Sequence, residues 1–257
     1  MKNSPKRVWY SAGLLLLSIW VGVMVISWTM RGTAVSAGSN QFIYLPLIIK
    51  QTNDPVPFGP VHTGDGTYYY ATGAGNCAFD PSPQNMMVAA LNHVDYANAA
   101  YCGAYIQVTG PQGSVMVRIV DQCANCPEGD VDLSVEAFAQ IAPISAGRVP
   151  ISWQFVSPPL DGPVQYYFKP DSHTYWMALQ MRNHRNPIAK FEFWNGSSFV
   201  EIPRAAYNYY EIQSSGGPFK SPFTFRVTDY FGNVLVDSNI PFSPGVAVNG
   251  SAQFPAP

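Results

Sequence analysis

Basic residues are scarce in the first half of the folded sequence. The whole chain has 14 Lys+Arg and 16 Asp+Glu, but residues 63–157 contain only Arg118 and Arg148 against eight acids. Residues 161–257 are balanced, with seven residues of each sign. An acidic surface argues against nucleic acid and against tight binding to anionic polymers. It remains compatible with an uncharged partner.

Charged residues are absent altogether from residues 8–30. Lys2, Lys6 and Arg7 precede this apolar run, and a small-residue pattern at 35–37 follows it. The arrangement is typical of an export signal spanning residues 1–37. A run of this length could also remain as an uncleaved N-terminal anchor. In both cases the rest of the chain is expected outside the cytoplasm, and it contacts a membrane only if the leader is uncleaved.

Metal ligands are also few. The four histidines form no cluster, and the chain has a single Cys-x-x-Cys, at Cys123 and Cys126. Because a zinc site normally needs a second such pair or two suitable histidines, we expect no metal and no cofactor. With Cys77 and Cys102, the even count in an exported chain favours two disulfides, and three pairings are open. A redox role for the Cys-x-x-Cys would need a βαβ setting, which the sequence does not show.

The composition divides the rest of the chain into four parts. Residues 38–62 are rich in Ser, Gly, Asn and Pro and are expected to form a tether. Residues 63–157 contain short β-prone runs between Gly- and Pro-rich turns, which indicates a mostly β barrel. Residues 158–163 contain three prolines and predict a stiff linker. Residues 164–257 contain strand-length runs without a helical pattern, which indicates a β-sandwich.

The most informative stretch is residues 121–138, which holds Asp121, Asp130 and Asp132 around the Cys-x-x-Cys. A buried strand is expected before it, at 115–120, and a short helix after it, with Ser134 as N-cap. A second helix is a weaker expectation at 86–91. Carboxylates placed between a strand and a helix are held firmly, as a site that handles polysaccharide requires. The alternative is that these acids only cap turns and helix ends.

A set of short motifs, in this order and spacing, resembles the expansin family, in particular its bacterial and fungal expansin-like members. The motifs are Gly66-Thr-Tyr-Tyr, Gly75-Asn-Cys-Ala-Phe-Asp80, Tyr101-Cys-Gly103, Val120-Asp-Gln-Cys123, Val131-Asp-Leu-Ser134, Tyr175-Trp176, Met181-Arg-Asn-His184, Tyr207-Asn208 and Gln253-Phe-Pro255. The resemblance implies a six-stranded double-psi β-barrel followed by an immunoglobulin-like β-sandwich that binds carbohydrate. It also implies non-hydrolytic loosening of cell-wall networks.

The resemblance assigns roles in the barrel. Asp132 matches the family's essential aspartate, which is the general acid in glycoside hydrolases that share the barrel. The base of those hydrolases falls on Ala71, which cannot take a proton. Losing general-base assistance typically costs ~10²–10⁴-fold in rate, so efficient hydrolysis is not expected. Thr67, Tyr69 and Asp121 match residues that line the groove.

The resemblance also assigns roles in the sandwich and to the cysteines. Tyr175, Trp176 and Tyr207 match a flat aromatic row that binds glycan, and Lys169 matches a basic residue beside it. Flat rings suit the CH faces of β-glucans, although core packing is the alternative for any single aromatic. The implied disulfides are Cys77–Cys102 and Cys123–Cys126, the second of them stiffening the groove wall.

The expected protein is therefore a secreted, cell-wall-associated monomer that binds an insoluble polysaccharide such as cellulose or xylan. Two alternatives are open. One is a weak endoglucanase or peptidoglycan lytic transglycosylase on the same barrel, and the other is a carbohydrate-binding envelope protein without further activity.

Overall fold

The computed structural model describes residues 54–257, which belong to one compact unit. The predicted export signal and most of the predicted tether lie outside the described residues. Among the helices of residues 54–257, none is long and apolar enough to cross a membrane.

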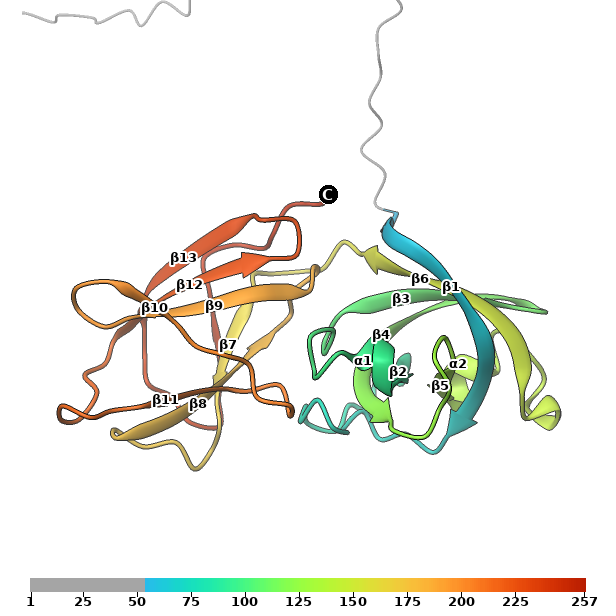
Figure 1. The fold of residues 1–257 in the computed structure, drawn as a ribbon, viewed down its shortest axis with the longest axis horizontal. Helices are drawn as coiled ribbons and strands as arrows, with labels where there is room; N and C mark the ends of the chain where they lie inside the picture. Colours follow the sequence, from blue (N-terminus) through green and yellow to red (C-terminus); the bar gives the residue numbers. More distant parts are fainter. Residues whose placement is uncertain (1–53) are drawn as a thin grey trace, which may run out of the picture. The chain divides into compact units, whose positions relative to one another are not determined.

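The first half of the described chain is a closed six-stranded barrel (Figure 1). Its strands follow the order β1-β5-β2-β4-β3-β6 around the barrel. They are β1 (Val56–Tyr69), β2 (Val88–Asn92), β3 (Tyr105–Gly110), β4 (Gly113–Cys123), β5 (Val131–Ser134) and β6 (Val149–Ser157). Two neighbouring pairs, β1 with β5 and β2 with β4, are parallel, and the other neighbours are antiparallel.

Alternating burial explains why these segments form strands. In β4 the side chains of Val115, Val117 and Ile119 enter the barrel core, as the period of two requires. One of the Gly- and Pro-rich turns, Gly110-Pro-Gln-Gly113, forms a hairpin in which Gly110 and Gly113 close the β3–β4 ladder.

The first strand begins before the expected edge of the barrel. β1 starts at Val56, which pairs with Ser157 of β6, so it extends into the stretch expected to be tether. The sequence shows no alternation there, because it contains Pro57, Gly59 and Pro60. Pro is tolerated at strand ends and bulges, and the ladder indeed shifts register between Phe58 and His62.

The barrel carries three short helical segments, α1 (His93–Tyr96), α2 (Val135–Phe138) and the 3₁₀ turn η1 (Ile144–Ala146). The expected helix after Asp132 is confirmed as α2, and Ser134 Oγ accepts its N-cap hydrogen bond from Ala137 N. The weaker helix expectation at 86–91 is wrong. Most of that segment belongs to β2, which is buried along its whole length. A short apolar run shows no period that would distinguish a strand from a helix.

The second half is a sandwich of two four-stranded sheets, β10-β9-β12-β13 and β11-β8-β7-β14. Their strands are β7 (Gln165–Phe168), β8 (Trp176–Arg182), β9 (Ile188–Trp194), β10 (Phe199–Glu201), β11 (Tyr210–Gln213), β12 (Phe223–Asp229), β13 (Val234–Ile240) and β14 (Ala247–Asn249). Aromatic side chains dominate the core, with Tyr166 and Phe191 packed around Phe225. The predicted fold class, a barrel followed by a β-sandwich, is confirmed.

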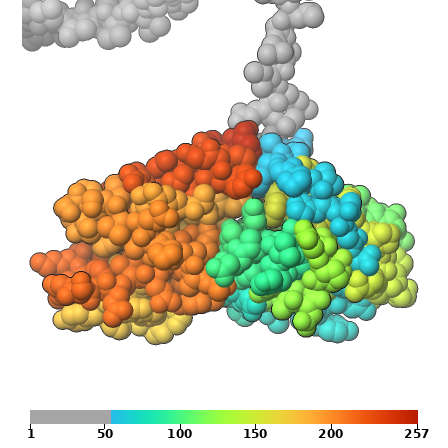
Figure 2. Space-filling view, viewed as in Figure 1, coloured from blue at the N-terminus to red at the C-terminus, as the bar shows by residue number. Residues whose placement is uncertain are grey.

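Specific polar contacts join the barrel and the sandwich. Arg204 Nη1 donates to the carbonyl oxygens of Ala99 and Ala100. Figure 2 shows green atoms of the barrel in contact with orange atoms of the sandwich. Gln180 Nε2 on β8 donates to the Cys77 carbonyl at 2.9 Å. The Gln180 bond attaches the barrel loop that holds Cys77 to the outer face of the sheet that contains β8.

Candidate functional site

Thr67 and Asp132 lie side by side in the barrel. They are register partners of the parallel strands β1 and β5, and Thr67 Oγ1 donates to Asp132 Oδ1 at 2.6 Å. Since alternate residues of a strand share a face, Asp65, Thr67 and Tyr69 all project to this side of β1.

The surroundings of Asp132 raise the pKa of its carboxyl. Burial raises the pKa of Asp132 above its ordinary value, and the charge of Asp121 raises it further. The hydrogen bond from Thr67 and the charge of Arg148 lower this pKa, but burial dominates. Asp132 is therefore suited to exchanging a proton or hydrogen bonds with a sugar oxygen.

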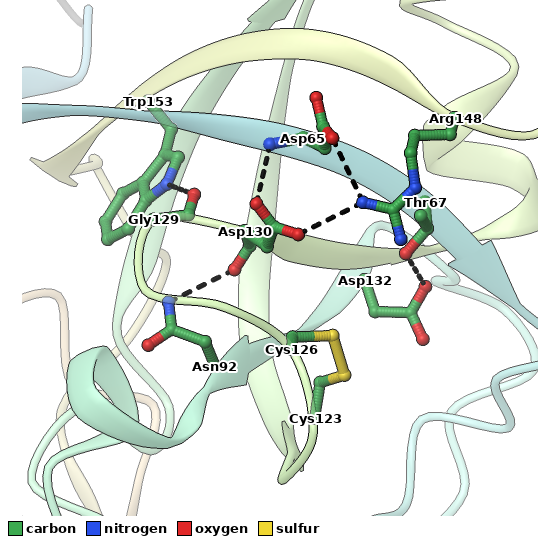
Figure 3. A network of polar contacts seen from close by, with 10 residues as sticks. All are labelled: Asp65, Thr67, Asn92, Cys123, Cys126, Gly129, Asp130, Asp132, Arg148 and Trp153. Atoms are coloured by element: carbon green, nitrogen blue, oxygen red, sulfur yellow. Dashed lines mark hydrogen bonds and ion pairs between the residues drawn. A yellow bond between two sulfur atoms is a disulfide. The ribbon is translucent and has the colours of Figure 1, made fainter.

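The loop before Asp132 is fixed from several directions (Figure 3). Asp130 Oδ1 accepts from the backbone N–H of Asp65 at 2.8 Å, and Arg148 Nη1 lies between Asp65 Oδ2 and Asp130 Oδ2 at 3.1 and 3.2 Å. Asn92 Nδ2 donates to the Asp130 carbonyl, and Trp153 Nε1 donates to the Gly129 carbonyl at 2.7 Å. These bonds hold β5, and hence Asp132, in a defined position.

Asp121 anchors a neighbouring loop. Its Oδ1 accepts from the backbone N–H groups of Asn76 at 2.7 Å and Gln122 at 2.8 Å. The loop approaches so closely that a Cβ added to Gly75 would lie 2.3 Å from Asp121 Cγ. Asp121 thus has a structural role in holding this loop through Oδ1.

Tyr69 brings a neutral phenol to the same side of the barrel. Its OH is buried and has no hydrogen-bond partner within residues 54–257. Burial, followed by the charges of Asp121 and Asp132, raises the pKa of Tyr69. Ala71, where the resemblance to expansins would place a hydrolase base, carries no ionisable group.

Both disulfides implied by the resemblance are present. Cys77 joins Cys102, and Cys123 joins Cys126 at the end of β4. The first pair is fully buried in the barrel core. The second closes a tight ring between Asp121 and the loop that leads to Asp130.

The outer face of the sheet β11-β8-β7-β14 carries several aromatic rings. Trp176 packs against a small cluster formed by Tyr167, Ala178 and Tyr209. Tyr207 lies 5.5 Å from Tyr209 between ring centroids and is 38% exposed. The face therefore presents a partly exposed aromatic surface.

Tyr175 and Trp176 are adjacent in sequence, so a regular strand would direct them to opposite faces. Tyr175 instead lies in the turn before β8, between the bridged residues His173 and Trp176, and it is 53% exposed. Lys169 Nζ lies 5.7 Å from the Trp176 ring centroid and also pairs with Asp171 at 2.7 Å. Both aromatics can thus reach solvent from one end of the sheet.

The sequence analysis did not identify two residues that contribute to these sites, one in the barrel and one in the sandwich. Arg148 is one of only two basic residues in the acidic segment, and that rarity was a usable signal. Tyr209 lies two residues after Tyr207, but Asn208 between them has a positive φ of 64°, so no strand alternation in the sequence indicated that the two rings lie together.

Comparison with known proteins agrees with this architecture. Residues 67–153 match the family described as "Lytic transglycolase". The chain is 32% identical over 213 residues to Expansin-YoaJ of Bacillus subtilis (strain 168), which covers 77% of this chain and 88% of that protein. It is 28% identical to Expansin-like protein 3 of Dictyostelium discoideum, over 67% of this chain and 56% of that protein.

Solved structures give the same result. The apo form of the Clavibacter michiganensis expansin is 33% identical and covers 77% of this chain and 100% of its own, with a TM-score of 0.71. A mutant of that expansin in complex with cellohexaose is 32% identical, with the same TM-score and coverage. Similarity of this extent across both the barrel and the sandwich shows that the chain belongs to the expansin family.

Proposed function

We propose that this protein binds neutral β-glycans and loosens cell-wall networks without hydrolysing them. The proposal rests on the contacts that already engage the other carboxylates near Asp132. Asp65 and Asp130 share Arg148, and Asp121 holds a loop through Oδ1. A glycosidase needs a second carboxylate flanking the scissile bond, and Ala71 supplies none.

Asp132 would act by exchanging hydrogen bonds with glycan hydroxyls, and its carboxyl donates or accepts according to its protonation. These are the same types of bond that hold one glycan chain to another. Replacing a glycan–glycan bond with a protein–glycan bond changes the free energy little, so chains can slip without covalent cleavage. The Tyr69 hydroxyl is buried, so any contact of Tyr69 with a glycan would be through its ring.

Binding is assigned to Tyr175, Trp176 and Tyr207, with Lys169 at their edge. Rigid rings pack on the CH faces of a β-glucan with little loss of conformational entropy. The complex of the Clavibacter expansin with cellohexaose supports a glucan as the occupant. The predicted export signal supports action outside the cell, at the wall.

The alternative function that an observation favours is a peptidoglycan lytic transglycosylase, because residues 67–153 match the family described as "Lytic transglycolase". In such a reaction a hydroxyl of the sugar replaces water as the nucleophile, so a single carboxyl could both protonate the leaving oxygen and accept the hydroxyl proton. Release of anhydro-sugar fragments from purified peptidoglycan would favour this function over loosening.

The test is mechanical extension of cellulose composites under constant load. The native protein should increase extension, and Asp132→Asn should remove most of the increase while binding to the composite remains. Asp161→Asn, a substitution of an exposed linker acid, is the matched control and should behave like the native protein. Equal extension with native protein and Asp132→Asn would refute the role of Asp132.

A further inference from the structure

A pocket of about 280 Å³ lies where the barrel meets the sandwich. None of the groove and aromatic residues assigned above lines it. Its walls come from the barrel side chains of Phe79, Asp80 and Arg118 and from Arg182 and His184 of the sandwich. In a predominantly acidic barrel, this pocket brings two arginines together.

Arg118 has no counter-charge. It lies in the middle of β4, opposite Tyr105, and its guanidinium lies 4.8 Å from the Phe79 ring centroid. Among the ion pairs and hydrogen bonds of residues 54–257, none involves the Arg118 side chain. Burial lowers the pKa of Arg118, and the nearby charge of Arg182 also lowers it, against the opposing effect of Tyr105.

Arg182 is only partly neutralised. Its Nη1 pairs with Asp80 Oδ2 at 2.7 Å, and its Nε donates to Gln180 Oε1 at 2.7 Å. Its Nη2 is buried and has no hydrogen-bond partner in the described part of the chain. Asp80 is the only carboxylate that lines the pocket, and its side chain is 64% exposed.

His184 adds no charge to the pocket. Its Nδ1 donates to the Asn186 carbonyl at 2.8 Å, and burial lowers its pKa to about 4. The pocket therefore contains two guanidinium groups, one carboxylate and a neutral imidazole. Half-buried cations without a counter-ion are unfavourable, and a bound anion would relieve their repulsion.

We propose that this pocket binds an oxyanion between Arg118 and Arg182. The planar guanidinium group offers paired N–H donors that match the oxygens of a carboxylate, phosphate or sulfate. The Arg118 donors are unpaired, so this residue would be the principal ligand. A free inorganic anion and the carboxylate of an acidic sugar in a wall polymer share this chemistry.

The test is a titration of the native protein with inorganic phosphate at constant ionic strength, followed by ¹H–¹⁵N NMR. Saturable shifts of the Gly103 amide and of the arginine side-chain signals are expected. Arg118→Gln should weaken binding at least tenfold, because it removes the unpaired charge. Shifts that never saturate, or equal affinity in Arg118→Gln, would overturn the proposal.

A second variant distinguishes binding from a structural role. Asp80→Asn removes an exposed carboxylate that competes for Arg182, so phosphate affinity should rise severalfold. If Asp80→Asn instead binds phosphate more weakly than the native protein, the site is refuted. Because the reference is the native protein, this result remains decisive if Arg118→Gln fails to fold.

Two further titrations identify the source of the anion. If an oligomer of galacturonic acid shifts the same signals and competes with phosphate, the pocket recognises acidic sugars. If phosphate alone shifts them, a free inorganic anion is the ligand. Both results support an oxyanion site, whereas no shift with either probe rejects it. Failure of this proposal would leave the loosening function unaffected, because no groove residue is involved.

Discussion

Thr67 Oγ1 donates a 2.6 Å hydrogen bond to Asp132 Oδ1 across the parallel strands β1 and β5. This bond stabilises the ionised carboxylate and so lowers the pKa of Asp132, while burial acts in the opposite direction. The barrel register thus places beside Asp132 a hydroxyl that lowers its pKa, against the larger effect of burial.

Replacing that hydroxyl should raise the pKa of Asp132. In Thr67→Val the carboxylate loses a donor while burial is unchanged, so protonation should occur at higher pH. The measurement is the ¹³C chemical shift of the Asp132 carboxyl as a function of pH. Thr63→Val, an exposed substitution on the same strand, should leave the titration unchanged. An unchanged or lowered pKa in Thr67→Val would contradict this account.

The aromatic face should provide most of the affinity for insoluble cellulose. Trp176→Ala removes a ring worth roughly 1–2 kcal/mol of apolar contact, or about 5–30-fold in affinity. Binding isotherms on cellulose measure this change. Trp194→Ala is the matched control, because Trp194 is 37% exposed but belongs to the opposite sheet. Similar losses in the two variants would show that Trp176 has no particular role.

The two disulfides should differ in their effect on stability. Cys77–Cys102 closes a separation of 25 residues and Cys123–Cys126 one of 3. Constraint of the unfolded chain then contributes about 3.5 kcal/mol for the first and about 1.5 kcal/mol for the second. Denaturant unfolding of the two Cys→Ser double variants measures this difference. The larger loss is expected without Cys77–Cys102, and the reverse order would contradict the expectation.

His184 should make the fold sensitive to acid. Its folded-state pKa is about 4, below the ordinary value of about 6.5, so the unfolded state binds a proton that the folded state excludes. Stability is therefore retained above pH ~6.5 and falls by up to about 3 kcal/mol as the pH drops to ~4.

Chemical unfolding between pH 4 and pH 7 measures this loss. His184→Gln should flatten the pH dependence in that range, while His93→Gln, at an exposed position, should not. A native protein equally stable at both pH values would refute the assignment to His184.

The sequence predicted those elements whose signals are local. The helix cap at Ser134, the hairpin between Gly110 and Gly113 and the alternation in β4 each rest on a few adjacent residues. The β2 segment was misjudged because all its residues are buried, so its sequence shows no alternation. The short strands β11 and β14 are defined by pairing with β8 and β7, which no local pattern in the sequence indicates.

The candidate site divides in the same way. Thr67, Tyr69, Asp121 and Asp132 were named from motifs, and the structure places Thr67 in contact with Asp132. The part played by Arg148 depends on contacts over long sequence separations, with Asp65 and Asp130. The hydrogen bond that Asp121 accepts from Asn76 likewise joins residues 45 positions apart in the sequence. No local pattern encodes such distances.

The central claim is that the groove lacks a second carboxylate able to support hydrolysis. Prolonged incubation of the native protein with soluble β-glucan, followed by quantification of new reducing ends, tests it most directly. The account predicts reducing ends no higher than those produced by Asp132→Asn, under conditions in which the native protein extends cellulose composites. Steady release of reducing ends by the native protein, absent from Asp132→Asn, would contradict it.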